Sequence, residues 1–300
     1  MIEPVTLTAG DGCVLHGVRR PAGPPGAPTV LVVHSANQTH RAMLPLAARL
    51  AARAEVVLPD LRGFGDSVCP DPAAHTWDRL AADIREWVAA IRERTGGPVL
   101  LAGFALGAGV AVRAAADAEA QIGTNAGTNA GTNAGAGASA DALAVISPHH
   151  MPGEPVDPAV AARNRGLADL IERDGRDAVL EPWLASLRPH LAEPLRRDIG
   201  LTDQASLIAS FRGLAATSPV TDADVVRRAG RAVRRLLVVP GDDPSHPAEV
   251  GARYAELFGE VGVPTLSGAL AGVRQPSAER WAEAVAEPLL ALIGTMTAEC

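Results

Sequence analysis

The chain has 300 residues, 47% of them hydrophobic, and a formal net charge of -7 at pH 7. This length and apolar content suffice for one large single-core domain, and the negative charge without a basic stripe argues against a nucleic-acid partner. No apolar stretch of about twenty residues is free of charge, and the N-terminus lacks a basic region followed by an apolar one, so we expect no membrane association and no export.

Five short apolar runs bounded by turn residues predict buried parallel strands. In chain order they cover residues 29–34, 54–60, 98–103, 142–147 and 234–241. Helical patterns at 41–54 and 77–97 lie between them, and the second ends on glycine. Strands that alternate with helices indicate an α/β protein with a doubly wound, mostly parallel sheet.

From residue 151 the strand signal stops, and helical patterns with polar faces follow at 163–175 and 203–216. We therefore predict a helical cap of residues 151–224, inserted between a first part of the core, 1–150, and a second part, 225–300. Ligands of open α/β sheets bind beyond the carboxyl ends of the strands, so a cap that emerges there would cover the pocket.

One segment, GTNAGTNAGTNAGAGASA at residues 123–140, repeats the unit Gly-Thr-Asn-Ala three times. Its small and polar residues cannot bury enough apolar area to offset the entropy of ordering. We expect a flexible loop on the face of the sheet opposite the site.

The run LLAGFALGAGVAV turns from a strand pattern into a helix pattern through closely spaced glycines, with Ala105 at the tightest point. Together with VVHSANQTHRAMLPLAARL, VVLPDLRGFGDS and LLVVPGDDPSHPAEV, this run resembles the α/β-hydrolase superfamily with a helical cap. The resemblance covers nearly the whole chain, and DLRGFGDS is among its more specific motifs.

The resemblance implies that Ala105 occupies the position of the nucleophilic serine. Gly103 and Gly107 permit the sharp turn, but a methyl group has no lone pair with which to attack a carbonyl. Asp243 matches the triad carboxylate. The triad histidine should follow the last strand, where Val273 marks the vacated position and no histidine occurs after residue 246. Loss of both groups favours natural loss of hydrolysis over an engineered serine replacement.

The oxyanion loop of the superfamily corresponds to HSAN, residues 34–37. By position, the N–H groups of Ala36 and Leu106 would point at an anionic oxygen. Ser35 stands where glycine is usual. Its hydroxyl is conceivable as a substitute nucleophile, but we favour a loop hydrogen bond because no base is identifiable beside it.

Histidines follow two of the predicted strands at their carboxyl ends: His34 on one, and His149 and His150 on another. Neutral imidazoles there can act as general acids or bases without a covalent intermediate, and loop histidines bonded to backbone carbonyls are the alternative. His246 lies in the turn DPSHP, where we expect its imidazole to cap the following helix, with catalysis as a secondary role.

We expect no cofactor, because the chain has no glycine-rich nucleotide motif and its adjacent histidines lack a spaced third metal ligand. Three cysteines, Cys13, Cys69 and Cys300, are odd in number and widely spaced, which fits a reducing cytoplasm rather than a disulfide framework.

The first functional hypothesis is a repurposed, non-hydrolytic enzyme of cyclase, lyase or isomerase type that acts on a small apolar metabolite. It would use Asp243, histidine acid-base chemistry and the two backbone amides. The alternatives are a pseudoenzyme that binds a small apolar ligand, and a serine esterase, thioesterase or lactonase in inactivated form. The oligomeric state stays open.

Overall fold

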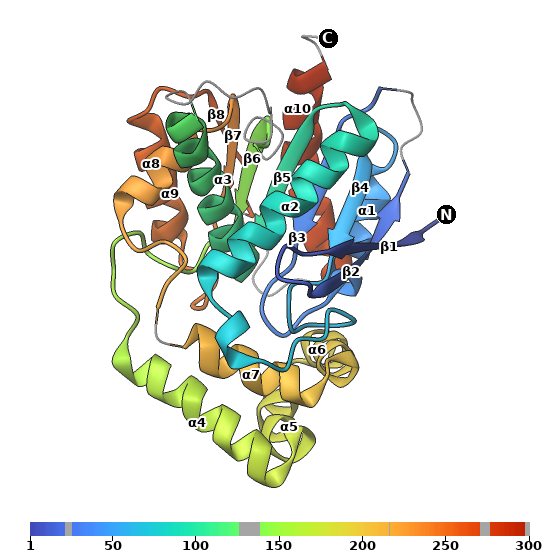
Figure 1. Cartoon of the computed structure of the whole chain (residues 1–300), viewed down its shortest axis with the longest axis vertical. Coiled ribbons are helices and arrows are strands. Elements are labelled where there is room, and N and C mark those ends of the chain that lie inside the picture. Colours follow the sequence, from blue (N-terminus) through green and yellow to red (C-terminus); the bar gives the residue numbers. More distant parts are fainter. Residues whose placement is uncertain (22–25, 126–138, 216, 271–276, 298–300) are drawn as a thin grey trace.

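The computed structural model describes residues 1–21, 26–125, 139–215, 217–270 and 277–297 (Figure 1). Eight strands in these ranges form one sheet of order β1-β2-β4-β3-β5-β6-β7-β8. The strands are β1 (Glu3–Thr8), β2 (Val14–Arg20), β3 (Thr29–Val33), β4 (Glu55–Pro59), β5 (Val99–Phe104), β6 (Ala142–Ile146), β7 (Arg235–Val239) and β8 (Thr265–Ser267). The two N-terminal strands pair antiparallel, and the other six pair parallel, so the predicted fold class is confirmed.

Helices cover both faces of the sheet. The core helices are α1 (Leu44–Leu50), α2 (Trp77–Thr95), α3 (Leu106–Asn125), α8 (Ala223–Arg231), α9 (Ala248–Gly259) and α10 (Ala278–Thr297), with short 3₁₀ helices η1 (His40–Met43) and η2 (Pro72–Ala74). Alternate strand residues face opposite ways: Leu31 and Val33 pack with α2 and α3, whereas Val30 and Val32 pack with α1 and α10. This two-sided burial explains why β3 reads as one continuous apolar run.

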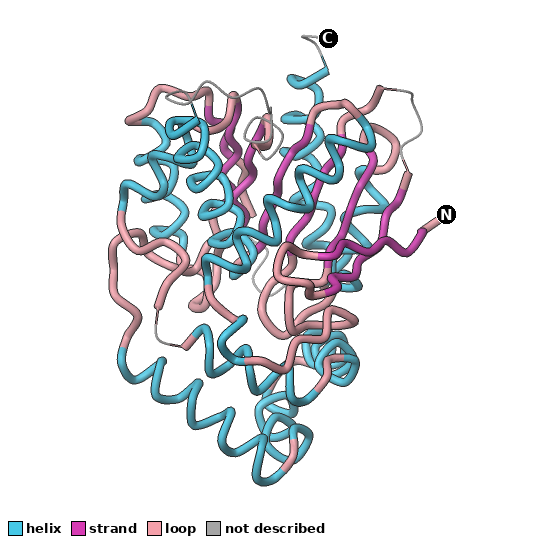
Figure 2. Tube along the Cα trace, viewed as in Figure 1, coloured by secondary structure: helices cyan, strands magenta, loops and turns pink. Residues whose placement is uncertain are grey.

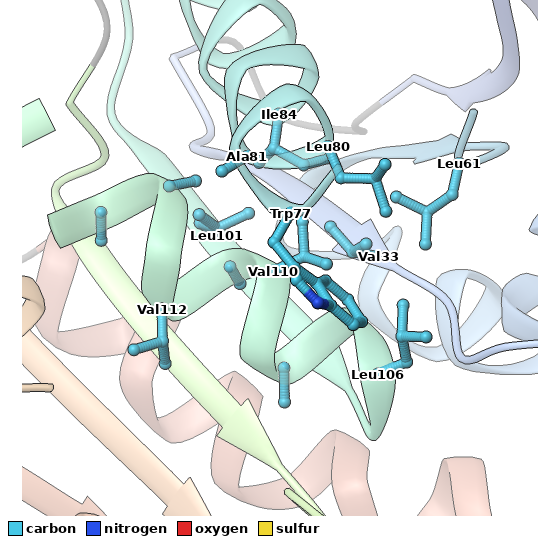
Figure 3. Packing of buried hydrophobic residues seen from close by; sticks show 14 of the residues in the cluster. Val33, Leu61, Trp77, Leu80, Ala81, Ile84, Leu101, Leu106, Val110 and Val112 are labelled. Carbon is cyan, nitrogen blue, oxygen red and sulfur yellow. The ribbon is translucent and has the colours of Figure 1, made fainter. Parts of the chain in front are cut away.

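The contact between α2 and α3 supports the start of α3. Figure 3 shows the Trp77 ring of α2 pointing towards α3 near Leu106 and Val110. All three residues belong to the same buried cluster, and so does Leu101 of β5. Close packing of these buried side chains therefore holds the strand-to-helix turn between β5 and α3 in place.

Four cap helices lie between β6 and α8, at one end of the sheet (Figures 1 and 2). They are α4 (Pro158–Asp174), α5 (Arg176–Ser186), α6 (Pro189–Leu201) and α7 (Gln204–Leu214). These helices fall inside the predicted insert, 151–224, whose last two residues already belong to α8.

Hydrogen bonds tie the cap to loops that follow β3 and β4. Thr39 N–H donates to Asp198 Oδ2 at 3.0 Å, Gly65 N–H to Thr202 Oγ1 at 3.2 Å, and Cys69 N–H to Ser206 Oγ at 2.9 Å. Because these loops leave the carboxyl ends of their strands, the cap covers the end of the sheet where the site is expected.

The low-complexity segment is described only at its ends. Helix α3 continues through residues 123–125, which the sequence places in the loop, and Ser139 Oγ donates to Ala232 O at 3.1 Å. Residues 126–138 lie outside the described ranges. Among the described helices, none is both long and apolar enough to cross a membrane.

Candidate functional site

A sharp turn joins β5 to α3 and places Ala105 at its tip. Ala105 has a φ of 51°, a left-handed value that is uncommon for a residue other than glycine, and its N–H donates to Ile146 O at 3.0 Å. A Cβ on Gly103 would lie 2.2 Å from Gly107 O, and one on Gly107 would lie 2.4 Å from Val33 O. Both glycines are therefore required by the close approach of the backbone. We call this strand-to-helix turn, residues 103–107, the elbow; its backbone has the geometry of the superfamily, but its tip carries a methyl group where a serine hydroxyl is usual.

Replacing Gly107 with alanine is expected to lower the free energy of unfolding by about 1–3 kcal/mol, because the methyl group would overlap the carbonyl oxygens of Val33 and His34. Gly294, within helix α10, meets no atom within 4 Å of an added Cβ. The same substitution there should raise stability by about 0.4–1 kcal/mol. Urea unfolding of the two variants checks the opposite signs, and a neutral Gly107→Ala would contradict the tight elbow.

Two backbone amides flank the turn. Ala36 lies in the loop after β3, and Leu106 is the first residue of α3. In the part of the chain that the structure describes, neither N–H donates a hydrogen bond. The loop that carries Ala36 touches the start of α3 at Gly107. Two free donors at adjoining backbone segments suit a developing negative charge on oxygen.

Ser35 is held through its backbone rather than its side chain. Its N–H donates to Gln38 Oε1 at 3.3 Å, and its carbonyl accepts from His34 Nδ1 at 2.7 Å. The hydrogen bond that we predict for its hydroxyl is not found among the described residues. Asn37, which follows in the same loop, has a φ of 59°.

His34 is fully buried, and both of its ring nitrogens have backbone partners. Nδ1 donates to Ser35 O, and Nε2 accepts from Leu61 N–H at 2.9 Å. Burial lowers the pKa of His34 and keeps the ring neutral. These contacts agree with the alternative prediction for His34, a loop histidine bonded to the backbone, because neither ring nitrogen is left to contact a substrate.

His149 and His150 follow β6, after Ser147, whose φ of 46° turns the chain sharply. Their ring centroids are 3.8 Å apart, and both Nδ1 atoms are buried without a partner among the described residues. Burial and the neighbouring His150 hold the pKa of His149 well below its usual range, although the nearby backbone of Ala105 opposes this shift. Burial lowers the pKa of His150 to about 4. Both rings are therefore neutral at pH 7 and lie close to the elbow.

His246 does not cap the following helix, and that expectation is wrong. Helix α9 has Pro247 as its N-cap, without a side-chain hydrogen bond. Instead, His246 Nδ1 lies 3.1 Å from Asp243 Oδ2 and 3.2 Å from Oδ1. The ring stacks on Phe104 at 5.8 Å and meets the ring of His149 edge-on at 6.2 Å. The structure thus groups His149, His150 and His246 and leaves His34 outside the group.

The turn that carries Asp243 is reachable from solvent. The side chains of His246 and Asp243 are 22% and 25% exposed. A surface depression of about 550 Å³ adjoins Asp243, and it is lined by Asp242, Asp243 and Glu249 on the core and by Arg188 on the cap. Val273, the predicted vacated histidine position, lies outside the described residues.

Sequence reasoning missed a second histidine-carboxylate pair, His40 and Asp60. Asp60 is buried and accepts from His40 N–H at 2.6 Å and from Nδ1 at 3.0 Å. Burial alone would raise the pKa of Asp60, but the bonds from His40 outweigh it and lower the value. The signal was available, since Asp60 opens the DLRGFGDS motif. The pair joins the segment after β3 to the segment after β4.

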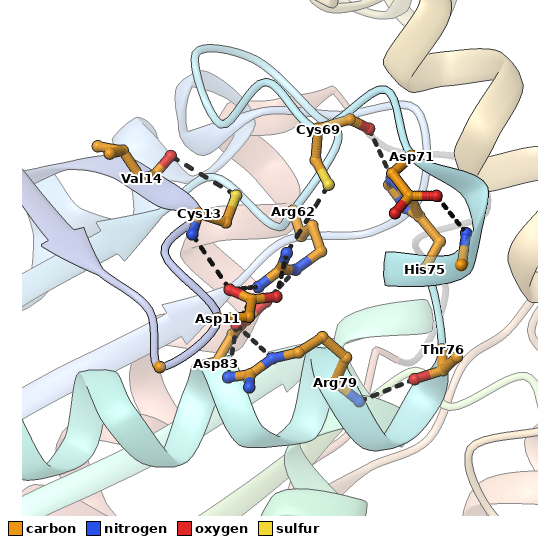
Figure 4. A network of polar contacts seen from close by, with 12 residues as sticks. Asp11, Cys13, Val14, Arg62, Cys69, Asp71, His75, Thr76, Arg79 and Asp83 are labelled. Atoms are coloured by element: carbon orange, nitrogen blue, oxygen red, sulfur yellow. Dashed lines mark hydrogen bonds and ion pairs between the residues drawn. The ribbon is translucent and has the colours of Figure 1, made fainter.

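The same motif contributes Arg62 to a buried polar network (Figure 4). Arg62 Nε and Nη2 donate to the two oxygens of Asp83 at 2.9 and 2.8 Å, and Nη1 lies 2.8 Å from Asp11. Nη1 also contacts Cys69 Sγ at 3.7 Å. The network fixes the loop after β4 from which Gly65 and Cys69 bond to the cap. Within the described residues, no cluster of three or more His, Cys, Asp or Glu could hold a metal ion.

Comparisons with known proteins agree with this architecture. The family model described as "Alpha/beta hydrolase family" matches residues 30–287. No curated protein matches the chain. Similar solved structures include an esterase from Thermogutta terrifontis, with 21% identity, coverage of 97% of this chain and 99% of that one, and a TM-score of 0.68.

Two further solved structures share the fold. An enol-lactonase from Burkholderia xenovorans is 16% identical, with 95% of this chain and 100% of that chain covered and a TM-score of 0.65. The bottromycin epimerase BotH, in complex with bottromycin A2, is 20% identical, with 98% and 99% covered and a TM-score of 0.60. At these identities the likeness concerns the fold alone.

Proposed function

The chain belongs to the alpha/beta hydrolase family, and from this premise we propose that it is a non-hydrolytic enzyme that moves a proton on a small, mainly apolar carbonyl compound. The observation that carries the proposal is the neutral ring of His149, placed beside an elbow whose tip is a methyl group. A neutral imidazole can accept a proton, whereas Ala105 cannot form an acyl intermediate.

In the proposed reaction, the substrate carbonyl oxygen accepts hydrogen bonds from Ala36 N–H and Leu106 N–H. His149 removes a proton from the adjacent carbon, and the electron pair of the broken C–H bond forms an enolate, whose negative oxygen the two amides stabilise. Return of a proton to the same carbon or to a neighbouring one gives an epimer or an isomer. The step needs no redox cofactor, because no electron leaves the substrate.

The family context supports this type of chemistry without fixing the substrate. Solved structures of the same fold include esterases, an enol-lactonase and an epimerase. The fold therefore carries both acyl transfer and inversion at carbon. Loss of the nucleophile from the elbow removes acyl transfer and leaves the amides available. We assign His34 a structural role, since its nitrogens are occupied by backbone groups.

The test is hydrogen exchange in deuterated buffer, followed by proton NMR on a panel of short α-substituted esters, lactones and N-acyl amino acid esters. We expect loss of the α-proton signal of at least one compound without cleavage of its ester. His149→Gln should slow this exchange by about 100-fold or more. His16→Gln, on strand β2 away from the elbow, is the matched control and should leave the exchange unchanged.

Two results would redirect the assignment. Cleavage of p-nitrophenyl acetate by the parent protein would contradict the non-hydrolytic proposal and direct attention to Ser35 or an activated water. Saturable binding of a panel compound that is recovered without exchange would favour the ligand-binding pseudoenzyme.

A further inference from the structure

We propose that Asp243 and His246 form an acid-base dyad that replaces the C-terminal histidine of the hydrolase triad. The resemblance places that histidine at position 273, where this chain has valine. The structure instead brings a histidine to the acid from only three residues further along the chain. The inference concerns the machinery of the site and does not depend on the substrate of the proposed reaction.

The hydrogen bonds of the turn determine which ring nitrogen carries the proton. An ionised carboxylate only accepts, so the Nδ1 atom that faces both oxygens of Asp243 must donate. In the neutral form of this ring, Nε2 of His246 carries the lone pair and can act as a base. Ser245 N–H and His246 N–H also donate to Asp243 Oδ1, at 2.8 and 3.1 Å, and these bonds hold the carboxylate in place. Asp243 is thus a positioning residue for the His246 ring.

Ring contacts place this base at the elbow. His246 stacks on Phe104, the residue immediately before Ala105, with an interplanar angle of 28°. On another side it meets His149 at an interplanar angle of 85°. The His149 ring in turn lies against the backbone of Ala105, so one ring separates His246 from the elbow on each of these two sides.

Close backbone packing keeps the turn in this conformation. A Cβ on Gly241 would lie 2.1 Å from His246 O and 2.4 Å from His246 Cβ. His246 N–H also donates to Asp243 O at 3.0 Å, which closes the turn. A histidine held this tightly loses little further freedom when it acts, as expected for an oriented base rather than a surface side chain.

From this placement we expect His246 to serve as the base for a hydroxyl introduced at position 105. Its oxygen would attack an ester carbonyl while His246 Nε2 takes its proton, and His246 would return that proton to the alcohol as the ester C–O bond breaks. Water would then attack the acyl group while His246 takes a proton from it, and His246 would give this proton to the serine oxygen as the acid leaves. One substitution should restore hydrolysis, and a histidine at position 273 should be unnecessary.

The first experiment measures p-nitrophenyl acetate hydrolysis. We expect Ala105→Ser to exceed the parent by about 100-fold or more, and His246→Gln or Asp243→Asn in that background to remove most of the gain. His16→Gln in the same background is the matched control and should retain it. The proposal is overturned if the Ala105→Ser activity is insensitive to His246→Gln, or if activity appears only when Val273→His is added.

The second experiment needs no activity and no substitution at the elbow. In protein with isotope-labelled histidine, nitrogen chemical shifts report which ring nitrogen carries the proton, and His246→Gln identifies the signals of that ring. We expect the Nδ1–H form in the parent and a shift towards the Nε2–H form in Asp243→Asn. An Nε2–H ring in the parent, or no change in Asp243→Asn, overturns the dyad. Failure of the deuterium-exchange test with an intact dyad would reject only the proposed function.

Discussion

Replacing Arg62 with methionine is expected to lower the free energy of unfolding by about 3 kcal/mol. Arg62 is 1% exposed and makes a two-point contact with the buried carboxylate of Asp83. Methionine keeps most of the side-chain volume but leaves the carboxylate without its main partner, a change that costs about 3–5 kcal/mol for buried pairs. We expect the lower end because Arg79 Nε still donates to Asp83 at 3.0 Å.

Urea unfolding of the variant checks this value, and the chain offers a matched control on its surface. Arg196 contacts Glu181 through the same two atoms, Nε and Nη2, at 3.0 and 2.8 Å, but this pair is solvent-exposed. Arg196→Met should change stability far less, because water already solvates both charges. Equal small losses in the two variants would show that the buried network contributes little, and that the loop after β4 is held mainly by its apolar neighbours.

The parallel part of the sheet could be predicted because strands that are buried on both faces appear in the sequence as continuous apolar runs. β3, β4 and β6 are five-residue runs buried throughout, and the predicted ranges overlap each of them. The N-terminal hairpin was missed because β1 alternates between half-buried and exposed residues. Of its half-buried residues only Val5 and Leu7 are apolar, so the alternation in the sequence is too short to indicate a strand. β8 has only three residues and too little sequence to carry a pattern.

The elbow and the two amides follow from the spacing of Gly103 and Gly107, since their backbone contacts leave no room for a side chain. The histidines are harder, because residue order gives the end of the sheet but not the direction of a ring. His34 follows Val33, the last residue of β3, one residue beyond the observed strand, and its Nε2 accepts from Leu61 N–H. The imidazole of His246 was expected to cap helix α9, but it contacts Asp243 instead, and its backbone packs closely against Gly241.

These differences share a physical cause. The order of apolar and polar residues along the chain indicates which residues are buried. The orientation of a polar ring depends instead on its hydrogen-bond partners, many of which belong to distant segments. The partners of His34 come from its own loop and from the segment after β4. For His149, the adjoining groups come from the turn of β5 and from the segment after β7. Apart from Ser35, which follows His34 directly, these groups lie far along the chain from the histidine that they contact.

Acidification from pH 6.5 to about 4 is expected to destabilise the fold through its neutral buried histidines. The pKa of His150 is lowered to about 4 by burial, so in this range the unfolded chain binds a proton that the folded chain does not. The stabilisation is complete above pH 6.5 and falls as pH falls. At about 1.4 kcal/mol per pH unit, His150 alone accounts for a loss of about 3 kcal/mol. His34, His75 and His149, whose pKa values are also lowered, add losses of the same sign.

Urea unfolding at intervals across this range measures how the free energy of unfolding changes with pH. The variant His150→Gln removes the contribution of the single proton that His150 binds. Glutamine is neutral at every pH in the range, so the difference in stability between parent and variant should shrink by about 3 kcal/mol from pH 6.5 to 4. The raised pKa of Asp83 acts in the opposite direction but is common to both proteins and cancels in the difference. A difference that stays constant with pH would mean that His150 is protonated as readily in the folded chain as in the unfolded one, and is therefore not shielded from water beside the elbow.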